Sequence, residues 1–231
     1  MRIIPTLALV VFLIPTLPNA GQIWNAHRSK DDVALCSEQC ELIREAVRQS
    51  DVNGLRSLLS LDGVTVGSVD HSVSLQAMQQ AAEEWNRALG SPHFRLSNPG
   101  EIPTVSVHKV NGITGNRDLQ GLIEVDETDK GLVSAKVWVD RQCGGRDLTD
   151  REVGAVLTHE LGHFLGLDDI PNGTGVMGEY DPKHIVVTPS QKEVRAVSAL
   201  RDKVQNTIAE IDGYHLNNMP IISPRTSLAT R

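Results

Sequence analysis

The residues best suited to chemistry lie in one stretch, HELGHFLGLDD, at positions 159–169. On a helix, His159 and His163 are four positions apart, so both imidazoles project from one face. Two imidazoles at this spacing can bind one zinc ion, and Glu160 can reach a water molecule on that metal. The spacing therefore predicts hydrolysis by metal-activated water, with Glu160 as the general base.

A third metal ligand is predicted shortly after the histidines. Gly166 can adopt the positive φ that ends a helix and turns the chain back, so that a later side chain reaches the metal from a third direction. The spacing favours Asp169 over its neighbour Asp168, which stays open as the ligand or as an acceptor for a histidine N–H. A further interpretation places Glu179 or Glu193 on the metal, although the turn at Gly166 is not needed for such a site.

The motif HExxHxxGxxD, followed by Val176-Met177, resembles the metzincin clan of zinc endopeptidases. The usual third ligand of that clan is histidine, and the aspartate version is similar to the snapalysin type, whereas the rest of the chain resembles a small bacterial matrixin. The resemblance implies one catalytic zinc ion bound by His159, His163 and Asp169. It also implies that Glu160 is the general base and that Met177 forms an apolar floor beneath the metal.

Strand and helix signals surround the motif in a definite order. Strands are predicted at 64–69, 94–96, 104–110, 121–125 and 132–139. One strand, one helix, several strands and then the motif helix is the order of the upper metzincin subdomain. The resemblance covers roughly residues 62–205 and is specific around 149–180. It implies an α+β fold, a metzincin-like zincin catalytic domain with a mixed twisted sheet, an active-site helix and a C-terminal helix.

Each predicted helix carries its own boundary signals. The helix at 74–89 ends at Gly90 and has an apolar face of Leu75, Met78, Ala82, Trp85 and Leu89. The active-site helix begins with a capping box, Thr149 to Glu152, and is anchored by Val153, Val156, Leu157 and Phe164. A second capping box, Thr188 to Gln191 with Pro189 at the first helical position, predicts the last helix. Its buried stripe is expected at Val194, Val197, Val204 and Ile208.

Four segments are predicted along the chain. They are a signal peptide at 1–20, an N-terminal helical segment at 21–61, the catalytic domain at 62–212 and a C-terminal tail at 213–231. The first segment has a positive start and an apolar run before a plausible cleavage site, which predicts a secreted or periplasmic protein without stable membrane association after cleavage. A membrane anchor is the alternative, but the run is short and broken by prolines. The second segment is either a pro-segment or an integral packing helix.

Three cysteines, Cys36, Cys40 and Cys143, leave the disulfide pairing open. Cys36 and Cys40 would lie four positions apart on one helix, which is poor geometry for a disulfide. The odd count leaves at least one free thiol or an intermolecular link. The Pro-Arg-Cys-Gly run by which some matrixin-like proteases hold a cysteine on zinc is absent.

The net charge of the chain and its predicted edge strand indicate which kinds of molecule it binds. The formal net charge of −7 gives no basic surface for nucleic acid. We expect a monomer that acts on a protein or peptide substrate. The resemblance implies that the substrate adds in extended form to an edge strand near 121–125, and that residues 170–176 line a pocket. The acidic turn DETDKG at 126–131 could hold calcium, although a solvated turn is the more ordinary interpretation.

A second interpretation comes from a different class of protein. The chain would be a catalytically inactive, zinc-stabilised, exported binding module. A ligand set kept only for structure needs no base at position 160, so the presence of Glu160 favours the enzyme. Tyr180 is one position away from the spacing at which some metzincins bring a tyrosine to zinc, and it is assigned no ligand role.

Overall fold

The computed structural model describes residues 63–113, 120–127, 133–170 and 173–217. The predicted signal peptide, the predicted segment at 21–61 with Cys36 and Cys40, and the chain beyond Asn217 lie outside these residues. Most of the acidic turn at 126–131 lies outside them too, so calcium binding there stays a prediction. Within the described part of the chain, no helix combines the length and the apolar character needed to cross a bilayer.

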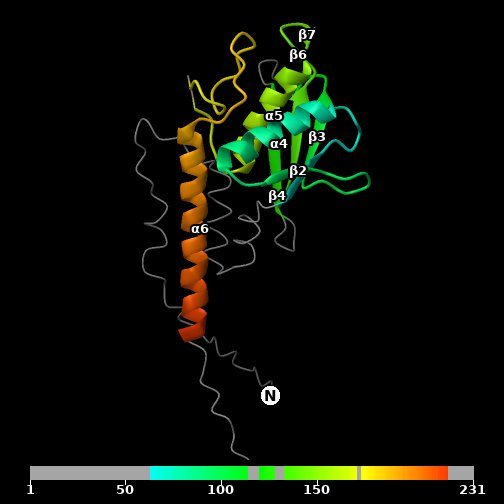
Figure 1. The fold of residues 1–231 in the computed structure, drawn as a ribbon. Coiled ribbons are helices and arrows are strands. Elements are labelled where there is room, and N and C mark those ends of the chain that lie inside the picture. Colours follow the sequence, from blue (N-terminus) through cyan, green and yellow to red (C-terminus); the bar gives the residue numbers. More distant parts are fainter. Residues whose placement is uncertain (1–62, 114–119, 128–132, 171–172, 218–231) are drawn as a thin grey trace, which may run out of the picture.

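A five-stranded mixed sheet forms one layer of the molecule (Figure 1). Its strands are β1 (Val64–Gly67), β2 (Phe94–Leu96), β3 (Val105–Val110), β4 (Gly121–Glu127) and β5 (Val133–Asp140), in the order β2-β1-β3-β5-β4. All pairings are parallel except that of β4 with β5, where Gly121 lies opposite Val139. The five predicted strands and the α+β fold class are therefore confirmed, and β4 lies at one end of the sheet.

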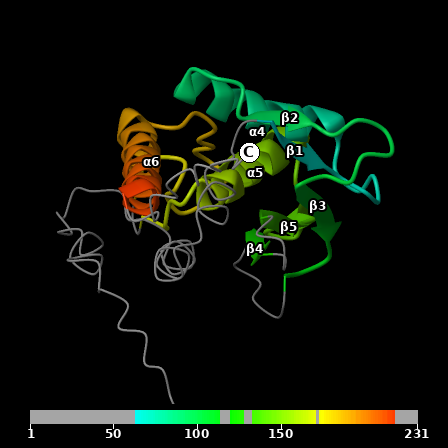
Figure 2. The ribbon, with the colours of Figure 1, turned by 90° about the horizontal axis from the view of Figure 1, so that it is seen from below.

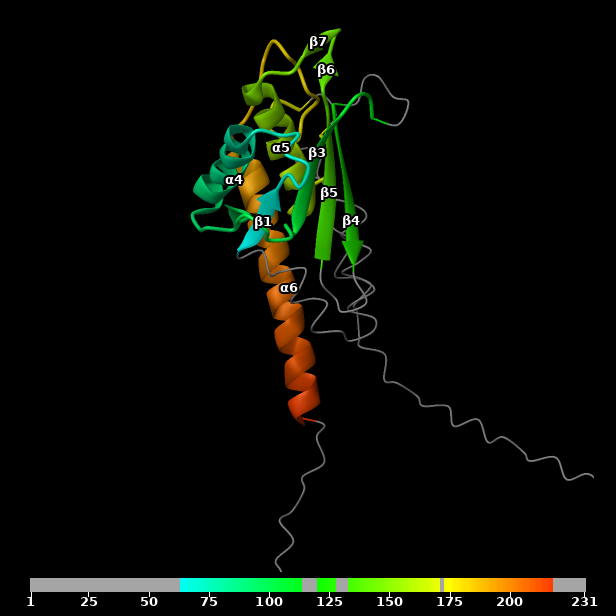
Figure 3. The ribbon, with the colours of Figure 1, turned by 90° about the vertical axis from the view of Figure 1, so that its right-hand side faces the viewer.

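Two helices, α4 (Leu75–Leu89) and α5 (Asp150–Phe164), cover one face of this sheet (Figure 3). Alternate valines of the strands and the apolar sides of both helices form the core. The Trp85 indole N–H of α4 donates to the Thr158 carbonyl of α5 at 2.7 Å. This bond fixes the two helices against each other beside the residues that carry the motif.

The buried face of α4 differs from the predicted face at its first residue. Ser74 caps the helix and Gly90 ends it with φ 70°, as expected. Leu75, however, is 62% exposed, and the face contains Ala77 and Ala81 instead. The prediction followed the large apolar side chains, whereas the small alanines allow α4 to approach its neighbours closely.

The third helix, α6 (Gln191–Asn217), lies on the side of α5 away from the sheet (Figure 2). Its predicted capping box is wrong, because Ser190 and Glu193 cap it with reciprocal bonds of 3.3 and 2.6 Å. Pro189 therefore precedes the helix, and the Thr188 hydroxyl donates to Glu84 of α4 instead. The helix continues five residues beyond the predicted domain end at residue 212.

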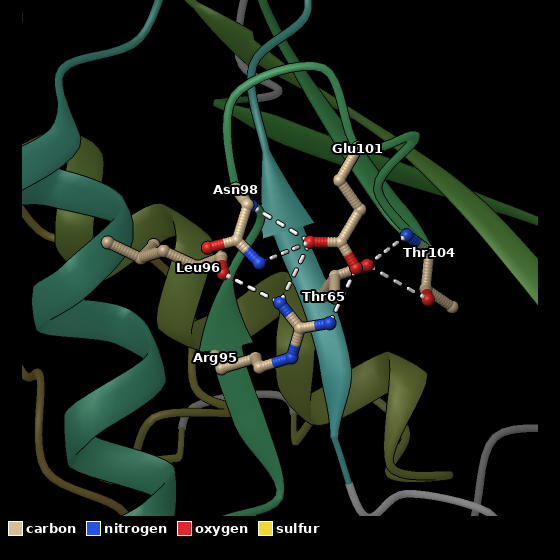
Figure 4. Close-up of polar contacts among 6 residues, drawn as sticks. All are labelled: Thr65, Arg95, Leu96, Asn98, Glu101 and Thr104. Atoms are coloured by element: carbon tan, nitrogen blue, oxygen red, sulfur yellow. Dashed lines mark hydrogen bonds and ion pairs between the residues drawn. The ribbon is translucent and has the colours of Figure 1, made fainter.

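Two short segments connect the sheet strands to each other and to α5. A small hairpin, β6 (Gln142–Cys143) and β7 (Arg146–Asp147), leads from the sheet into α5. Between β2 and β3, Arg95 binds Glu101 with both guanidinium nitrogens, and the Asn98 N–H donates to the same carboxylate (Figure 4). The guanidinium and the Asn98 N–H hold the pKa of Glu101 down, at about 2. These bonds hold the loop that connects β2 to β3.

Candidate metal centre

The two histidines of the motif lie on consecutive turns of α5. Their Nε2 atoms are 3.1 Å apart, and the two rings meet edge to face. The helix that carries them is rigidly held, since the Thr149–Glu152 capping box is present and Val153, Val156, Leu157 and Phe164 are all buried. The predicted spacing, cap and anchoring residues are confirmed.

Each histidine ring is oriented by a backbone carbonyl. The His159 Nδ1–H donates to the Val176 carbonyl and the His163 Nδ1–H donates to the Leu167 carbonyl, both at 2.8 Å. A carbonyl oxygen only accepts hydrogen bonds, so these contacts place the ring proton on Nδ1. Both Nε2 atoms therefore face the space between the rings and are the atoms available to a metal.

A glycine turn brings the third group to the histidines. Gly166 has φ 97°, and the Leu167 N–H donates back to the Gly162 carbonyl, so the chain reverses after α5. Asp169 Oδ1 then lies 3.1 Å from His159 Nε2 and 3.5 Å from His163 Nε2.

One ligand atom from each of His159, His163 and Asp169 lies within 4.8 Å of the others. The remaining ligand candidates lie elsewhere. Asp168 uses Oδ1 to accept from the Asp169 N–H, and Glu179 is exposed. Glu193 is bonded to the Met177 backbone and to its own helix cap. Tyr180 lies beside Glu152, and burial together with that carboxylate raises the pKa of its phenol.

Charge complementarity holds the cluster together. The hydrogen bonds from His159 and His163 lower the pKa of Asp169 far below its ordinary value. Burial lowers the pKa of His163, but the bond to Asp169 and the negative charge of Glu160 outweigh it and raise the pKa to about 9. The pKa of His159 is raised by the same two groups against its burial. The negative charges of Asp169 and Glu160 thus favour a positive charge on the two imidazoles, and a metal ion that binds there would displace protons from them.

Glu160 is buried next to this cluster, with 4% of its surface exposed. Its carboxylate lies against the start of β4, where a Cβ on Gly121 would be only 2.1 Å from Oε1. Burial raises the pKa of Glu160 and the charge on Asp169 adds to this, while His159 and His163 oppose it. A carboxylate with a raised pKa next to a metal-binding cluster is suited to accept and return a proton.

Met177 is fully buried behind the second half of α5. Its Sδ atom would lie 2.3 Å from a Cβ on Gly162, so the methionine packs directly on the helix backbone between the two histidines. The Met177 carbonyl accepts from the Ile170 N–H at 2.8 Å, next to Asp169. This turn thus contacts the segments that carry all three candidate ligands.

Sequence reasoning missed two residues of this environment. Gly121 contacts Glu160 from another element, and no local pattern could indicate that contact. Glu193 was considered only as a ligand. Its Ser-x-x-Glu spacing from Ser190 is a capping-box signal that could have placed it at the start of α6.

The donor set fits zinc, because two imidazole nitrogens and one carboxylate oxygen leave a fourth position open. In the comparisons with known proteins, residues 133–223 match the model of the family Peptidase_M43, described as pregnancy-associated plasma protein-A. None of the curated proteins compared with the chain matches it. The match contains α5, the Met177 turn and the whole of α6. It supports the predicted metzincin clan through the pappalysin family, and it lends no support to the matrixin or snapalysin resemblance.

Proposed function

We propose that this chain, a metalloendopeptidase with a Peptidase_M43 domain, binds its catalytic zinc through His159, His163 and Asp169. The observation that carries this proposal is the meeting of three ligand atoms within 4.8 Å beside a buried glutamate. The third ligand is then an aspartate, in the manner of the snapalysin type.

Glu160 is the proposed general base. Zinc bound in the cluster would polarise the scissile carbonyl and activate a water molecule. The Glu160 carboxylate accepts the proton of the attacking water and returns it to the leaving amine. Its raised pKa favours this role, since a carboxylate of ordinary pKa would hold the proton less well. No covalent intermediate is required, so the Cys143 thiol has no part in the reaction.

The substrate is proposed to bind in extended form along β4. This strand lies at one end of the sheet, and its first residue touches Glu160. A peptide that pairs with an open strand edge gains main-chain hydrogen bonds whatever its side chains. The scissile bond would then pass the carboxylate near Gly121. Residues 170–176, of which 171 and 172 lie outside the described residues, would line a side-chain pocket.

Export and a monomeric state complete the proposal. A signal at 1–20 would direct the protein out of the cytoplasm, as secreted or periplasmic enzyme. The inactive binding module is disfavoured by Glu160. Burying a carboxylate costs free energy, and a purely structural zinc site gains nothing from one whose pKa is raised.

Cleavage of an unstructured protein by the purified chain tests the proposal. Chelation should abolish cleavage, zinc should restore it, and Glu160→Ala should keep the zinc but lose cleavage. The matched control is Glu210→Ala, an exposed residue of α6. Zinc bound stoichiometrically without cleavage by either form would support the binding module instead. Unchanged zinc affinity in Asp169→Ala, together with a loss in Asp168→Ala, would contradict the ligand assignment.

A further inference from the structure

We infer that Glu193 is a positioning residue of the zinc site, acting on His159 through the peptide unit that joins Val176 to Met177. This inference rests on the proposed function, because it assumes that His159 binds zinc. Glu193 touches neither the metal ligands nor Glu160. Its influence follows from two hydrogen bonds at opposite edges of one peptide unit.

The two bonds belong to the same rigid group. The Val176 carbonyl accepts from His159 Nδ1 at 2.8 Å, and the Met177 N–H donates to Glu193 Oε1 at 2.8 Å. A trans peptide is planar, so its C=O and N–H point in opposite directions and turn together. A carboxylate on the N–H therefore fixes the direction of the carbonyl, and with it the plane of the His159 ring.

Charge is transmitted along with geometry. An ionised acceptor makes a stronger hydrogen bond than a neutral one and polarises the peptide, so that its carbonyl becomes a better acceptor. A stronger bond at Nδ1–H makes the Nε2 atom of His159 a better metal ligand. The hydrogen bonds thus run from the Glu193 carboxylate through the peptide to the His159 imidazole. This arrangement extends by one group the support that a metal-bound histidine usually receives.

Glu193 is itself held firmly. Its side chain is fully buried, and Oε2 accepts from the Ser190 N–H at 2.6 Å in the first turn of α6. Gly175 packs so closely that a Cβ there would be 2.4 Å from Oε1. The N-terminal end of α6 stabilises the negative charge. The long helix therefore provides a fixed base from which the Met177 turn is positioned.

His163 provides an internal comparison. Its Nδ1–H donates to the Leu167 carbonyl, which belongs to the Gly166 turn and not to the peptide held by Glu193. A purely structural role of Glu193 would disturb both histidines or neither. A positioning role should disturb His159 and leave His163 largely unchanged.

Zinc affinity, measured by competition with a chromophoric chelator, tests the inference. We expect Glu193→Ala to bind zinc about 10-fold more weakly or worse, the range found for groups that support metal ligands. Glu193→Gln should show a smaller loss, because its amide can accept from only one of the two N–H groups. Ser190→Ala is the matched control. It removes the hydroxyl cap of the same turn and keeps both backbone bonds of Glu193, so its zinc affinity should stay within about twofold of the wild type.

The second readout is the Nδ1–H proton of each histidine in the NMR spectrum of the zinc-loaded protein. The His159 signal should shift in Glu193→Gln and the His163 signal should stay in place. If Glu193→Ala does not fold, Glu193→Gln decides by both readouts. Wild-type zinc affinity and an unmoved His159 signal in that variant would overturn the inference while leaving the proposed function intact. A wild-type chain that binds no zinc would overturn both.

Discussion

Two regions of α5 each bury a glutamate, and the two surroundings shift its pKa in opposite directions. Glu152, in the first turn, is bound by Arg146 through both guanidinium nitrogens and by the Thr149 cap. The hydrogen bond from Arg146 leads in lowering its pKa, to about 2. Glu160, two turns later, has two histidines and an aspartate as charged neighbours, and its burial raises its pKa.

The difference shows what each buried carboxylate is for. Glu152 is surrounded by donors that favour its charged form, so its ionisation stabilises the helix start. Glu160 is held where the charged form is penalised, which costs stability and creates a group that readily takes a proton. Glu193 resembles Glu152 in accepting from backbone N–H groups, and one of these groups belongs to the Met177 turn beside the three candidate ligands.

Exchanging each carboxylate for its amide should separate the two roles. Glu160→Gln should lower kcat/KM by about 10²-fold or more, because the base is lost, and should leave the unfolding free energy unchanged or raised. Glu152→Gln should do the reverse, with zinc affinity and kcat/KM near the wild type and lower stability. Peptide cleavage and denaturant unfolding of both variants measure this. A Glu152→Gln enzyme as inactive as Glu160→Gln, though still folded, would erase the distinction.

The contact between Gly121 of β4 and Glu160 allows the role of Glu160 to be tested without replacing Glu160 itself. A Cβ on Gly121 would overlap Oε1, so Gly121→Ala should push the carboxylate away and lower kcat by about tenfold. Stability should fall as well, because the same Cβ would lie only 2.6 Å from Cγ1 of the buried Val156. Glu210→Ala, at an exposed residue of α6, is the control and should keep its kcat. Steady-state kinetics of the two variants give the answer, and an unaffected kcat in Gly121→Ala would show that Glu160 does not act from this position.

Substitutions at two glycines of α5, one in each region, test how tightly the two regions are packed. A Cβ on Gly162 would overlap the Met177 sulfur at 2.3 Å, while one on Gly154 would meet the end of the Gln80 side chain at 2.9 Å. Gly162→Ala should therefore destabilise the protein by about 1–3 kcal/mol. Gly154→Ala should cost less, because Gln80 can move and alanine favours the helix. Urea unfolding of both variants is the measurement, and equal losses would mean that Met177 yields as easily as Gln80.

The sequence predicted those parts of the site that depend on spacing within one segment. The two histidines, the cap at Thr149 and the turn at Gly166 all follow from helix geometry, and the structure has them. The contacts of Gly121 and Glu193 depend on how β4 and α6 pack against the rest, which no local pattern specifies. The start of α6 was misplaced because Thr188-Pro189 imitates a cap, whereas the threonine hydroxyl is bonded to Glu84 on another helix.

The smallest expected effect is the pH dependence of the unfolding free energy that Glu152 contributes. The pKa of Glu152 falls from its ordinary 4.5 to about 2 on folding, so its contribution is present above pH 4.5 and is lost as the pH falls towards 2. With Arg146 half exposed, we expect this contribution to be on the order of 1–2 kcal/mol. The difference in unfolding free energy between wild type and Glu152→Gln should therefore shrink between pH 5 and pH 2. A difference that stays constant over this range would mean that packing and the neutral hydrogen bonds of the cap, and not the charge, hold the start of α5.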